Sequence, residues 1–211
     1  MIRSGEALAI GWSRNMLYSG FNTLHRSVFW SAYLNGRSDN TDVIRLKLER
    51  NRPMPLTMND LTISPANVNM DTLLDDWSWA IPEPLQPVLL TAMGDAFAQA
   101  TSGSVYFIDT VEGSVSLVAD NGAEFETLLT DTQFVTRYLF PSRIVQLREA
   151  GKTLSQQQIY SHTKPLVLGG DDNAENVEAT DVSVHVSIHG QIHRQVKDLP
   201  EGASVDNIVI E

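Results

Sequence analysis

SVYFIDTVEGSVSLV, residues 104–118, is the stretch of this sequence that decides its fold class. Its two halves are rich in β-branched and aromatic residues, and Val111-Glu112-Gly113 lies between them. Such residues favour strands, and a short glycine-containing loop between two such runs is typical of a β-hairpin. The stretch therefore predicts an antiparallel pair of strands, from which the neighbouring elements can be assigned in both directions.

Further elements are expected before the hairpin. Residues 87–92 and 95–99 are rich in apolar residues and are separated by a turn near Gly94, which predicts two more strands. Upstream of them, residues 70–79 place apolar side chains at helical spacing and predict a short helix.

Three helices are expected after the hairpin, over residues 121–129, 131–139 and 141–151. Pro141 suits the first turn of the third helix. Ile208-Val209-Ile210 is expected to close the chain as a final strand. Strands followed by helices and then by strands indicate an α+β fold, with a mostly antiparallel sheet packed with several short helices.

A composition break at Pro53-Met54-Pro55 divides the chain, because prolines oppose a helix and the basic part of the sequence ends there. Residues 1–57 are expected to form a basic N-terminal arm, in which residues 43–48 alternate like an edge strand. Two interpretations of the arm stay open: a poorly ordered segment, or residues that precede a natural start at Met58. Residues 58–211 are expected to form the α+β domain.

Composition excludes several classes of protein. The chain has 211 residues, no cysteine and a net charge of −11, and residues 58–211 by themselves carry −15. The lack of cysteine excludes a disulfide scaffold and a thiolate zinc site, and it suits a cytoplasmic protein. No apolar run approaches the roughly 20 residues that span a bilayer, and we identify no export signal. The acidity predicts a basic protein partner, with no direct binding of nucleic acid and no membrane association.

Three histidines recur every four residues, at His185, His189 and His193. On one helix they would share a face, and two of them could chelate zinc or nickel. Valine and isoleucine alternate over residues 184–188, however, which favours a strand over the first half of this segment. We therefore expect His185 to lie on a strand away from His193, with histidines that bond locally or face a partner and no metal site.

An acidic loop over residues 171–176 follows Gly169-Gly170. Clustered oxygens attract hard cations, but the spacing lacks the calcium-loop pattern. An exposed turn is therefore favoured, an acidic contact surface comes second and a metal site third. The chain has no nucleophile elbow, no Walker loop and no dinucleotide glycine motif. We assign no catalytic residue, no cofactor and no metal ligand from the sequence.

Several short motifs follow one another along residues 58–211 in a specific order. They are Trp77-x-Trp79, Gly94-Asp95-x-Phe97, residues 103–110, Gln158-Ile159-Tyr160, Leu168-Gly169-Gly170 and residues 187–195. In this order they resemble the C-terminal domain of bacterial type VI secretion immunity proteins, the family paired with DNase effectors. Some elements are also similar to the wider SUKH immunity superfamily.

The resemblance implies a cytoplasmic immunity protein, not an enzyme, that binds and neutralises a basic type VI secretion toxin, expected to be a nuclease. Two alternatives stay open: a regulatory protein-interaction module without a toxin partner, and a metal-dependent enzyme that uses the three histidines. The polar C-terminal part of the chain lies beside glycines that shape exposed turns, which makes it the expected contact surface. The candidate contact residues are Asp171, Asp172, Glu175, Asn176, His189, Gln191, His193 and Gln195.

Overall fold

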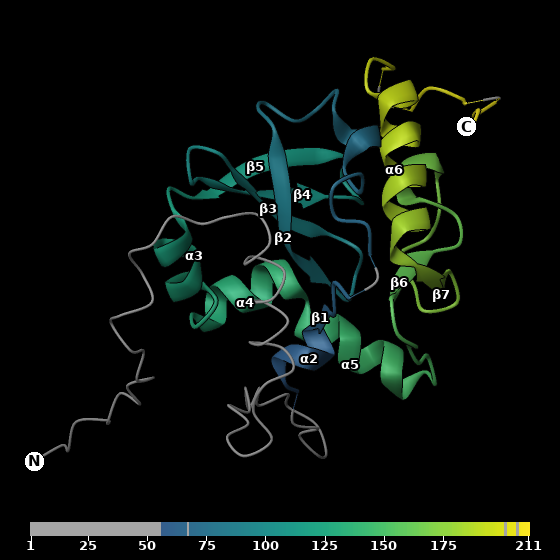
Figure 1. The fold of residues 1–211 in the computed structure, drawn as a ribbon. Helices are drawn as coiled ribbons and strands as arrows, with labels where there is room; N and C mark the ends of the chain where they lie inside the picture. The colour runs from purple at the N-terminus through teal and green to yellow at the C-terminus, as the bar shows by residue number, and fades with distance from the viewer. Residues whose placement is uncertain (1–55, 67, 201, 206) are drawn as a thin grey trace, which may run out of the picture.

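A five-stranded sheet forms the centre of the computed structural model, which describes residues 56–66, 68–200, 202–205 and 207–211. Neighbouring strands are antiparallel and pair in chain order, so the sheet is a meander (Figure 1). The strands are β1 (Thr62–Ile63), β2 (Leu85–Thr91), β3 (Ala96–Ala100), β4 (Val105–Asp109) and β5 (Ser114–Ala119). The predicted hairpin and the two strands expected before it are confirmed.

Both faces of this sheet are buried, because alternate residues of a strand point to opposite sides. Phe97 and Phe107 belong to one hydrophobic cluster, whereas Ala96 and Ile108 belong to a second. In β2, the five residues 87–91 are all buried. Other elements must therefore cover the sheet on both sides.

Three short helices pack on the cluster that contains Phe97. They are α3 (Gly122–Leu128), α4 (Thr132–Leu139) and α5 (Pro141–Glu149). The side chains of Asn121 and Asp131 accept hydrogen bonds from the first turns of α3 and α4, and Pro141 occupies the first turn of α5. These caps explain where the helices begin, and the three predicted helices are confirmed.

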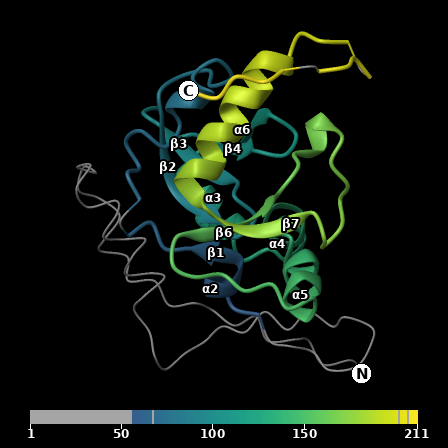
Figure 2. The ribbon, with the colours of Figure 1, turned by 90° about the vertical axis from the view of Figure 1, so that its right-hand side faces the viewer.

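One strand of a two-stranded sheet and a long helix contribute to the second cluster, whereas Val177 of the other strand packs in the first. These elements are β6 (Gln158–His162), β7 (Val177–Asp181) and α6 (Val182–Val196), together with the one-turn 3-10 helix η2 (Asp75–Trp77). Helix α6 runs along the right-hand side of the molecule beside β6 and β7 in Figure 1, and it lies in front, facing the viewer, in Figure 2. Two smaller elements are α2 (Met58–Leu61) and η3 (Leu166–Leu168). The α+β prediction, with a mostly antiparallel sheet and several short helices, is confirmed.

Two predicted elements have a different structure. Residues 70–79 form turns and the single turn of η2, because the indoles in this segment bond to α6 and hold it in an irregular path. Residues 184–188 lie on a helix and not on a strand. The carboxylate of Asp181 accepts hydrogen bonds from the first turn of α6 and fixes its start. A helix also buries Val186 on the side of the histidines, which the alternating pattern alone did not predict.

Two predictions concern the ends of the chain. Residues 208–210 form no strand, and the expected strand over residues 43–48 lies outside the described residues. The domain boundary at Met58 stays a prediction, although Leu56 is only 1% exposed and packs in the first cluster. Among the helices that the structure describes, none combines the length and the apolar character needed to cross a membrane.

Candidate functional site

Helix α6 places its three histidines on one face, because residues four apart on an α-helix lie nearly above one another. His185, His189 and His193 are 2%, 3% and 5% exposed. The ring centroids of His185 and His189 are 4.1 Å apart, and those of His189 and His193 are 6.2 Å apart. The prediction that His185 lies on a strand away from His193 is therefore wrong, and the rings form one buried row.

All three rings contact a single residue of the turn after β4, Thr110. His189 Nδ1 and His193 Nε2 donate to the backbone carbonyl oxygen of Thr110 over 2.8 and 3.0 Å. His185 Nε2 lies 2.9 Å from the hydroxyl oxygen of Thr110. The hydroxyl and the backbone N–H of Thr110 both donate to Asp95 Oδ1, over 3.0 and 2.9 Å. Thr110 therefore joins α6 to the turn between β2 and β3.

The direction of these hydrogen bonds determines the tautomer of His185. Because the hydroxyl proton of Thr110 is donated to Asp95, the same oxygen accepts the proton on His185 Nε2. His185 Nδ1 then carries no proton and accepts from Ser161 Oγ, which lies 2.8 Å away. Both ring nitrogens of His185 are therefore occupied. We name these residues the histidine cluster: Asp95, Thr110, Ser161, His185, His189 and His193.

Burial disfavours the charged forms of the ionisable groups in the histidine cluster. Loss of water lowers the pKa of His189 to about 4, although its bond to the Thr110 carbonyl favours the charged form. Burial likewise lowers the pKa of His193 and moves the pKa of His185 well below its ordinary value. In the opposite sense, burial and the nearby Asp109 carboxylate raise the pKa of Asp95 to about 7. These side chains act as hydrogen-bond partners inside the core.

Two glycines let the histidine row approach the turns of the sheet. A Cβ atom at Gly94 would overlap the ring of His185, and a Cβ atom at Gly113 would overlap the ring of His193. Both glycines also have a positive φ, of +95° and +67°. Any other residue would be strained there and would push α6 away from the sheet.

A third glycine lets η2 pack against α6 itself. A Cβ atom at Gly190 would lie 2.8 Å from the carbonyl oxygen of Asp76 and 2.9 Å from Trp77 Nε1. The indole of Trp77 donates to the carbonyl oxygen of Val186 over 2.8 Å, and that of Trp79 donates to the carbonyl oxygen of Gly190 over 3.1 Å. Two of the motifs that carry the resemblance, Trp77-x-Trp79 and residues 187–195, therefore meet at this contact.

Hydrogen bonds within the histidine cluster hold α6 against the sheet. Within the described residues, no group of three or more histidine, cysteine, aspartate or glutamate side chains has a geometry that could hold a metal ion. The ring nitrogens His185 Nδ1 and Nε2, His189 Nδ1 and His193 Nε2 bond to Ser161 and Thr110. His189 and His193 lie in the core, so a partner could reach them only if α6 moved away.

The acidic loop over residues 171–176 lies on the surface, and internal bonds define its shape. Asn176 Nδ2 donates to the carbonyl oxygen of Lys164 over 2.8 Å, and Asn176 Oδ1 accepts from Lys164 N over 2.9 Å. Asp172 forms an ion pair with Arg143 over 2.7 Å. Of the predicted contact residues in this loop, Asn176 therefore has a structural role and Asp172 has a compensated charge.

Four other predicted contact residues are accessible to solvent. Asp171 and Glu175 are exposed and form no ion pair with another described residue. Gln195 is exposed and Gln191 is partly exposed, and both lie on the outer face of α6. The structure therefore brings Gln191 and Gln195 together on one helix face, whereas Asp171 and Glu175 belong to the separate acidic loop.

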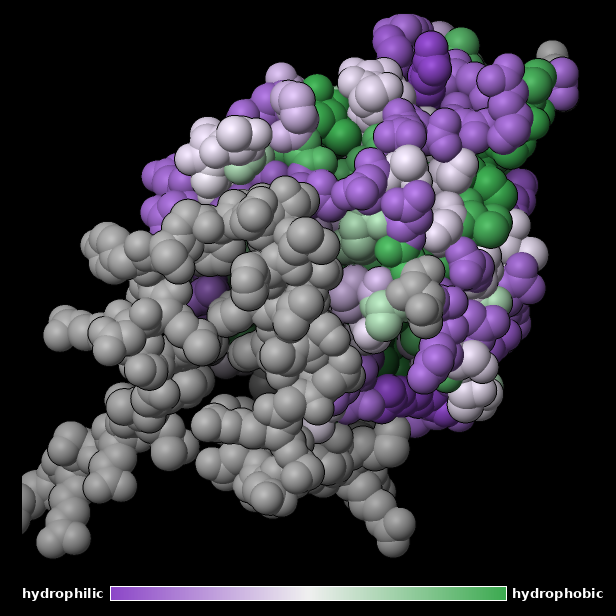
Figure 3. All heavy atoms as spheres, viewed as in Figure 1, coloured by the Kyte–Doolittle hydropathy of each residue, from purple (hydrophilic) through white to green (hydrophobic). Residues whose placement is uncertain are grey.

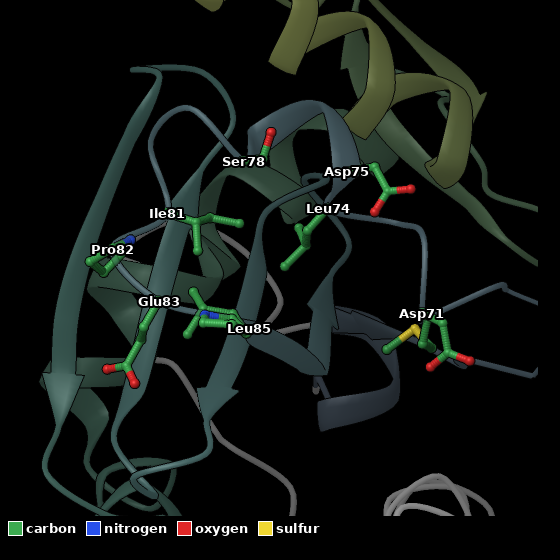
Figure 4. A pocket seen from close by; sticks show the side chains of 10 residues that line it. Asp71, Leu74, Asp75, Ser78, Ile81, Pro82, Glu83 and Leu85 are labelled. Carbon is green, nitrogen blue, oxygen red and sulfur yellow. The ribbon is translucent and has the colours of Figure 1, made fainter.

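An open cleft of about 710 Å³ lies between η2 and the beginning of β2, within residues 70–85. The carboxylates of Asp71 and Asp75 lie on one side of it and that of Glu83 on the other, with aliphatic side chains between them (Figure 4). We name this hollow the acidic cleft. The sequence reasoning did not identify it, because its two sides approach each other only through the turns that replace the expected helix.

The part of the sequence that forms the acidic cleft contains no lysine or arginine. Residues 53–136 include 12 aspartates and glutamates but no lysine or arginine. The donors that reach the cleft carboxylates are neutral: Gln86 Nε2 lies 3.5 Å from Asp71, and the hydroxyl of Tyr106 lies 3.1 Å from Glu83. Over the described part of the face in Figure 3, hydrophobic residues occur in small areas among hydrophilic ones. The acidic cleft therefore combines carboxylates with apolar side chains.

Comparisons with known proteins agree with the resemblance seen in the sequence. Residues 119–193 match the family model described as "T6SS immunity protein Tdi1, C-terminal", which supports a type VI secretion immunity protein. The matched segment runs from the end of β5 into α6 and includes the three histidines of α6. No curated protein matches the chain. The resemblance to the C-terminal domain of type VI secretion immunity proteins is thus confirmed over this segment.

A solved structure also aligns with the chain: the crystal structure of Atu4351 from Agrobacterium tumefaciens. The two chains are 15% identical, with a TM-score of 0.46. The alignment covers 62% of this chain and 65% of that chain, which is less than two thirds of either.

Sequence reasoning missed the residues that connect the histidines to the sheet. Asp95 and Thr110 were identified only as parts of motifs, and Ser161 was given no role. A signal was nevertheless present, because Gly94-Asp95 and Thr110 belong to the same ordered set of motifs as the histidines. A polar residue beside apolar strand residues needs a hydrogen-bond partner when it is buried, and the histidines were the available partners.

Proposed function

We propose that this chain is a cytoplasmic immunity protein that binds a type VI secretion toxin and blocks it by contact, without catalysing a reaction. The observation that carries the proposal is the family match over residues 119–193. The interior is consistent with a binding protein, since its histidines are hydrogen-bonded within the core and none lines the acidic cleft.

The chemistry of the surface supports a basic toxin. The acidic cleft carries three carboxylates without a cation among its lining residues, and the chain is cation-free from residue 53 to residue 136. A field of one sign attracts an oppositely charged protein and accelerates its association. The aliphatic side chains between the carboxylates would pack against the stems of lysine or arginine residues.

A nuclease is the kind of toxin that fits this charge best. An enzyme that cleaves DNA or RNA must present a basic surface to the phosphate backbone. Carboxylates spaced across a cleft can pair with the same basic side chains and exclude the substrate. We therefore propose that the acidic cleft covers part of the nucleic-acid-binding surface of the toxin.

The exposed polar residues of the C-terminal part complete the proposed contact surface. Asp171, Glu175, Gln191 and Gln195 stay in the proposal because solvent reaches them. His189 and His193 are assigned a supporting role, which is to hold α6 in place. A rigidly held helix loses little conformational entropy on binding, so the histidine cluster would favour affinity without touching the toxin.

The direct test is neutralisation together with binding. A candidate toxin is sought among the genes beside that of this chain and is expressed in bacteria with and without the chain, and survival is measured. We expect survival only with the chain, and a stable complex of the two purified proteins. Survival without a complex would contradict blocking by contact, and a complex with a toxin that is not a nuclease would correct the proposed class.

A further inference from the structure

The outer face of α6 holds residues 207–211 through two glutamine side chains. Gln195 Nε2 donates to the carbonyl oxygen of Val209 over 2.8 Å, and Val209 N donates to Gln195 Oε1 over 3.1 Å. One helical turn earlier, Gln191 Nε2 donates to a main-chain carboxylate oxygen of the last residue, Glu211, over 3.3 Å, and Glu211 N donates to Gln191 Oε1 over 2.8 Å. Each amide side chain therefore pairs with both backbone groups of one residue, as a neighbouring strand would.

This pairing recognises backbone and not side chains. Val209 and Glu211 are two residues apart, and a period of two is the geometry of an extended chain. A glutamine amide offers an acceptor and two donors, so it matches the N–H and C=O groups of almost any residue. We name Gln191 and Gln195 the glutamine rail. The rail can hold an extended segment of nearly any sequence.

The segment now on the glutamine rail is held with little hydrophobic burial. Val209 is 57% exposed and Ile210 is 45% exposed. Hydrogen bonds between exposed groups replace similar bonds to water, so their net contribution is small. The rail can therefore exchange its occupant, whereas the histidine cluster on the inner face cannot open without exposing an interlinked polar network.

We propose that the glutamine rail docks an extended segment of the toxin, which displaces residues 207–211 when the complex forms. The inference rests on the proposed function and adds the mode of recognition. A chain of hydrogen bonds connects the rail to the acidic cleft: Gln191 Nε2 donates to Ser187 Oγ, and Ser187 Oγ donates to Asp76 Oδ2. The next residue towards the N-terminus, Asp75, lines the cleft. A toxin segment on the rail would therefore lie next to the surface that attracts its basic side chains.

The first experiment needs no toxin. In the full chain, Val209→Pro with Glu211→Pro removes both N–H donors of the segment and vacates the rail. A capped synthetic peptide with the sequence of residues 207–211 is then added at millimolar concentration. We expect it to shift the side-chain amide NMR signals of Gln191 and Gln195 in this variant. The parent should respond more weakly, because its own segment competes at an effective concentration on the order of millimolar.

A matched variant controls for side-chain loss and for charge. Val209→Ala with Glu211→Ala trims the same side chains and removes the same charge but keeps both N–H donors. It should behave like the parent. If the peptide produces no shift in the proline variant, the rail is not a docking site and the proposal is overturned.

The second experiment measures the affinity of the neighbouring toxin for the same proteins. The proline variant should bind about three- to tenfold more tightly, because the competing segment no longer occupies the rail. Gln191→Ala with Gln195→Ala should bind about tenfold more weakly, because the backbone of the toxin loses its partners. Opposite changes in affinity would distinguish docking from structural support. If the segment only stabilised the fold, both variants would bind the toxin more weakly than the parent.

The outcomes distinguish the two proposals. If the parent does not bind the toxin, the proposed function fails and this inference fails with it. If the parent binds tightly and both variants bind equally tightly, the proposed function stands and the docking role of the glutamine rail is wrong.

Discussion

Helix α6 carries two stripes of polar residues with the same four-residue spacing, and the two stripes have opposite environments. On the inner face, His185, His189 and His193 are buried and joined to Thr110. On the outer face, Gln191 and Gln195 contact solvent and an exposed segment of the same chain. Spacing alone therefore does not say which polar stripe supports the fold and which is available to a partner.

The difference comes from what each stripe would lose when its contacts open. An inner hydrogen bond that breaks leaves a buried donor or acceptor without water, which costs about 1–3 kcal/mol for each group. An outer bond that breaks is replaced by water at little cost. We therefore expect changes on the inner side to lower stability, and changes on the outer side to alter binding while the fold stays intact.

The largest effect is expected where the inner stripe meets a turn, in Gly94→Ala. The new Cβ atom would overlap the ring of His185 at a residue whose φ is +95°. Backbone strain and overpacking together should lower the free energy of unfolding by about 3–5 kcal/mol, as measured by urea denaturation. Gly103→Ala is the matched control, because φ there is +101° but no atom lies within 4 Å of the new Cβ. Equal losses in both variants would mean that the contact with His185 has no importance.

Thr110→Val should be the next most damaging change. Valine has nearly the shape of threonine but lacks the hydroxyl that bonds to His185 and Asp95. His185 Nε2 would lose its buried acceptor, whereas Asp95 would lose one donor and keep the backbone N–H of residue 110. The free energy of unfolding should fall by about 2–3 kcal/mol. Thr127→Val removes an exposed hydroxyl bond and should cost under about 0.5 kcal/mol. A small loss at Thr110 would show that the cluster rearranges easily.

The inner stripe should also make stability depend on pH. The pKa of His189 is about 4 in the folded protein against an ordinary value of 6.5, so the unfolded chain takes up a proton first on acidification. The free energy of unfolding should therefore fall between pH 6.5 and pH 4, by about 3 kcal/mol from this residue alone. His185 and His193 should add to the loss, because burial lowers the pKa of each.

Asp95 acts in the opposite direction and provides the control for the pH dependence. Its pKa is about 7 when folded and 3.8 ordinarily, so its protonation favours the folded state as the pH falls between these values. Asp95→Asn should remove this contribution and make the loss of stability in acid steeper, as measured by denaturation at several pH values. An unchanged slope would indicate that Asp95 does not titrate in this range.

Changes on the outer stripe should have a much smaller effect on the fold. Gln191→Ala with Gln195→Ala removes the four hydrogen bonds to Val209 and Glu211 and two bonds within α6, and should lower the free energy of unfolding by about 1 kcal/mol or less. Hydrogen exchange should accelerate at Val209 and Glu211 and stay unchanged in the core of α6. A loss as large as that of Thr110→Val would remove the distinction between the two faces.

The smallest effect on stability is expected in the acidic cleft. Asp71→Asn, Asp75→Asn and Glu83→Gln together should change the free energy of unfolding by under about 0.5 kcal/mol. The association rate with a basic toxin should fall about tenfold at low salt, and less at high salt. A control variant removes three exposed carboxylates elsewhere, with Glu149→Gln, Glu178→Gln and Asp198→Asn. Equal slowing in both variants would mean that net charge matters and the cleft does not.

Much of the fold was predictable because its signals are local. The hairpin over residues 104–118 has strand-forming residues on both sides of a glycine-containing turn, and α3 to α5 begin within one residue of the predicted starts. The segment 184–188 was misassigned because alternating valines fit a strand and a helix buried on one side. Only contacts with β6 and the turns of the sheet decide between the two, and these contacts lie far away in the sequence.

The candidate site was predictable only in part. The sequence pointed to the polar C-terminal region, and Gln191 and Gln195 are accessible there. It could not separate them from His189 and His193, because exposure depends on which side of α6 meets the sheet. It also could not predict the acidic cleft, whose walls are held by turns and not by a regular element.

The sequence by itself determined the α+β class, the helix boundaries at capping residues, the acidic charge and the resemblance to immunity proteins. These properties depend on composition, on neighbouring residues, or on motifs in order along the chain. Only the tertiary structure decided that the three histidines of α6 are buried hydrogen-bond partners that hold the helix in place. It also decided that Gln191 and Gln195 lie at the surface. Burial determines both roles. A polar group inside the core is destabilising unless it is hydrogen-bonded within the protein, whereas the same group at the surface can exchange water for a partner.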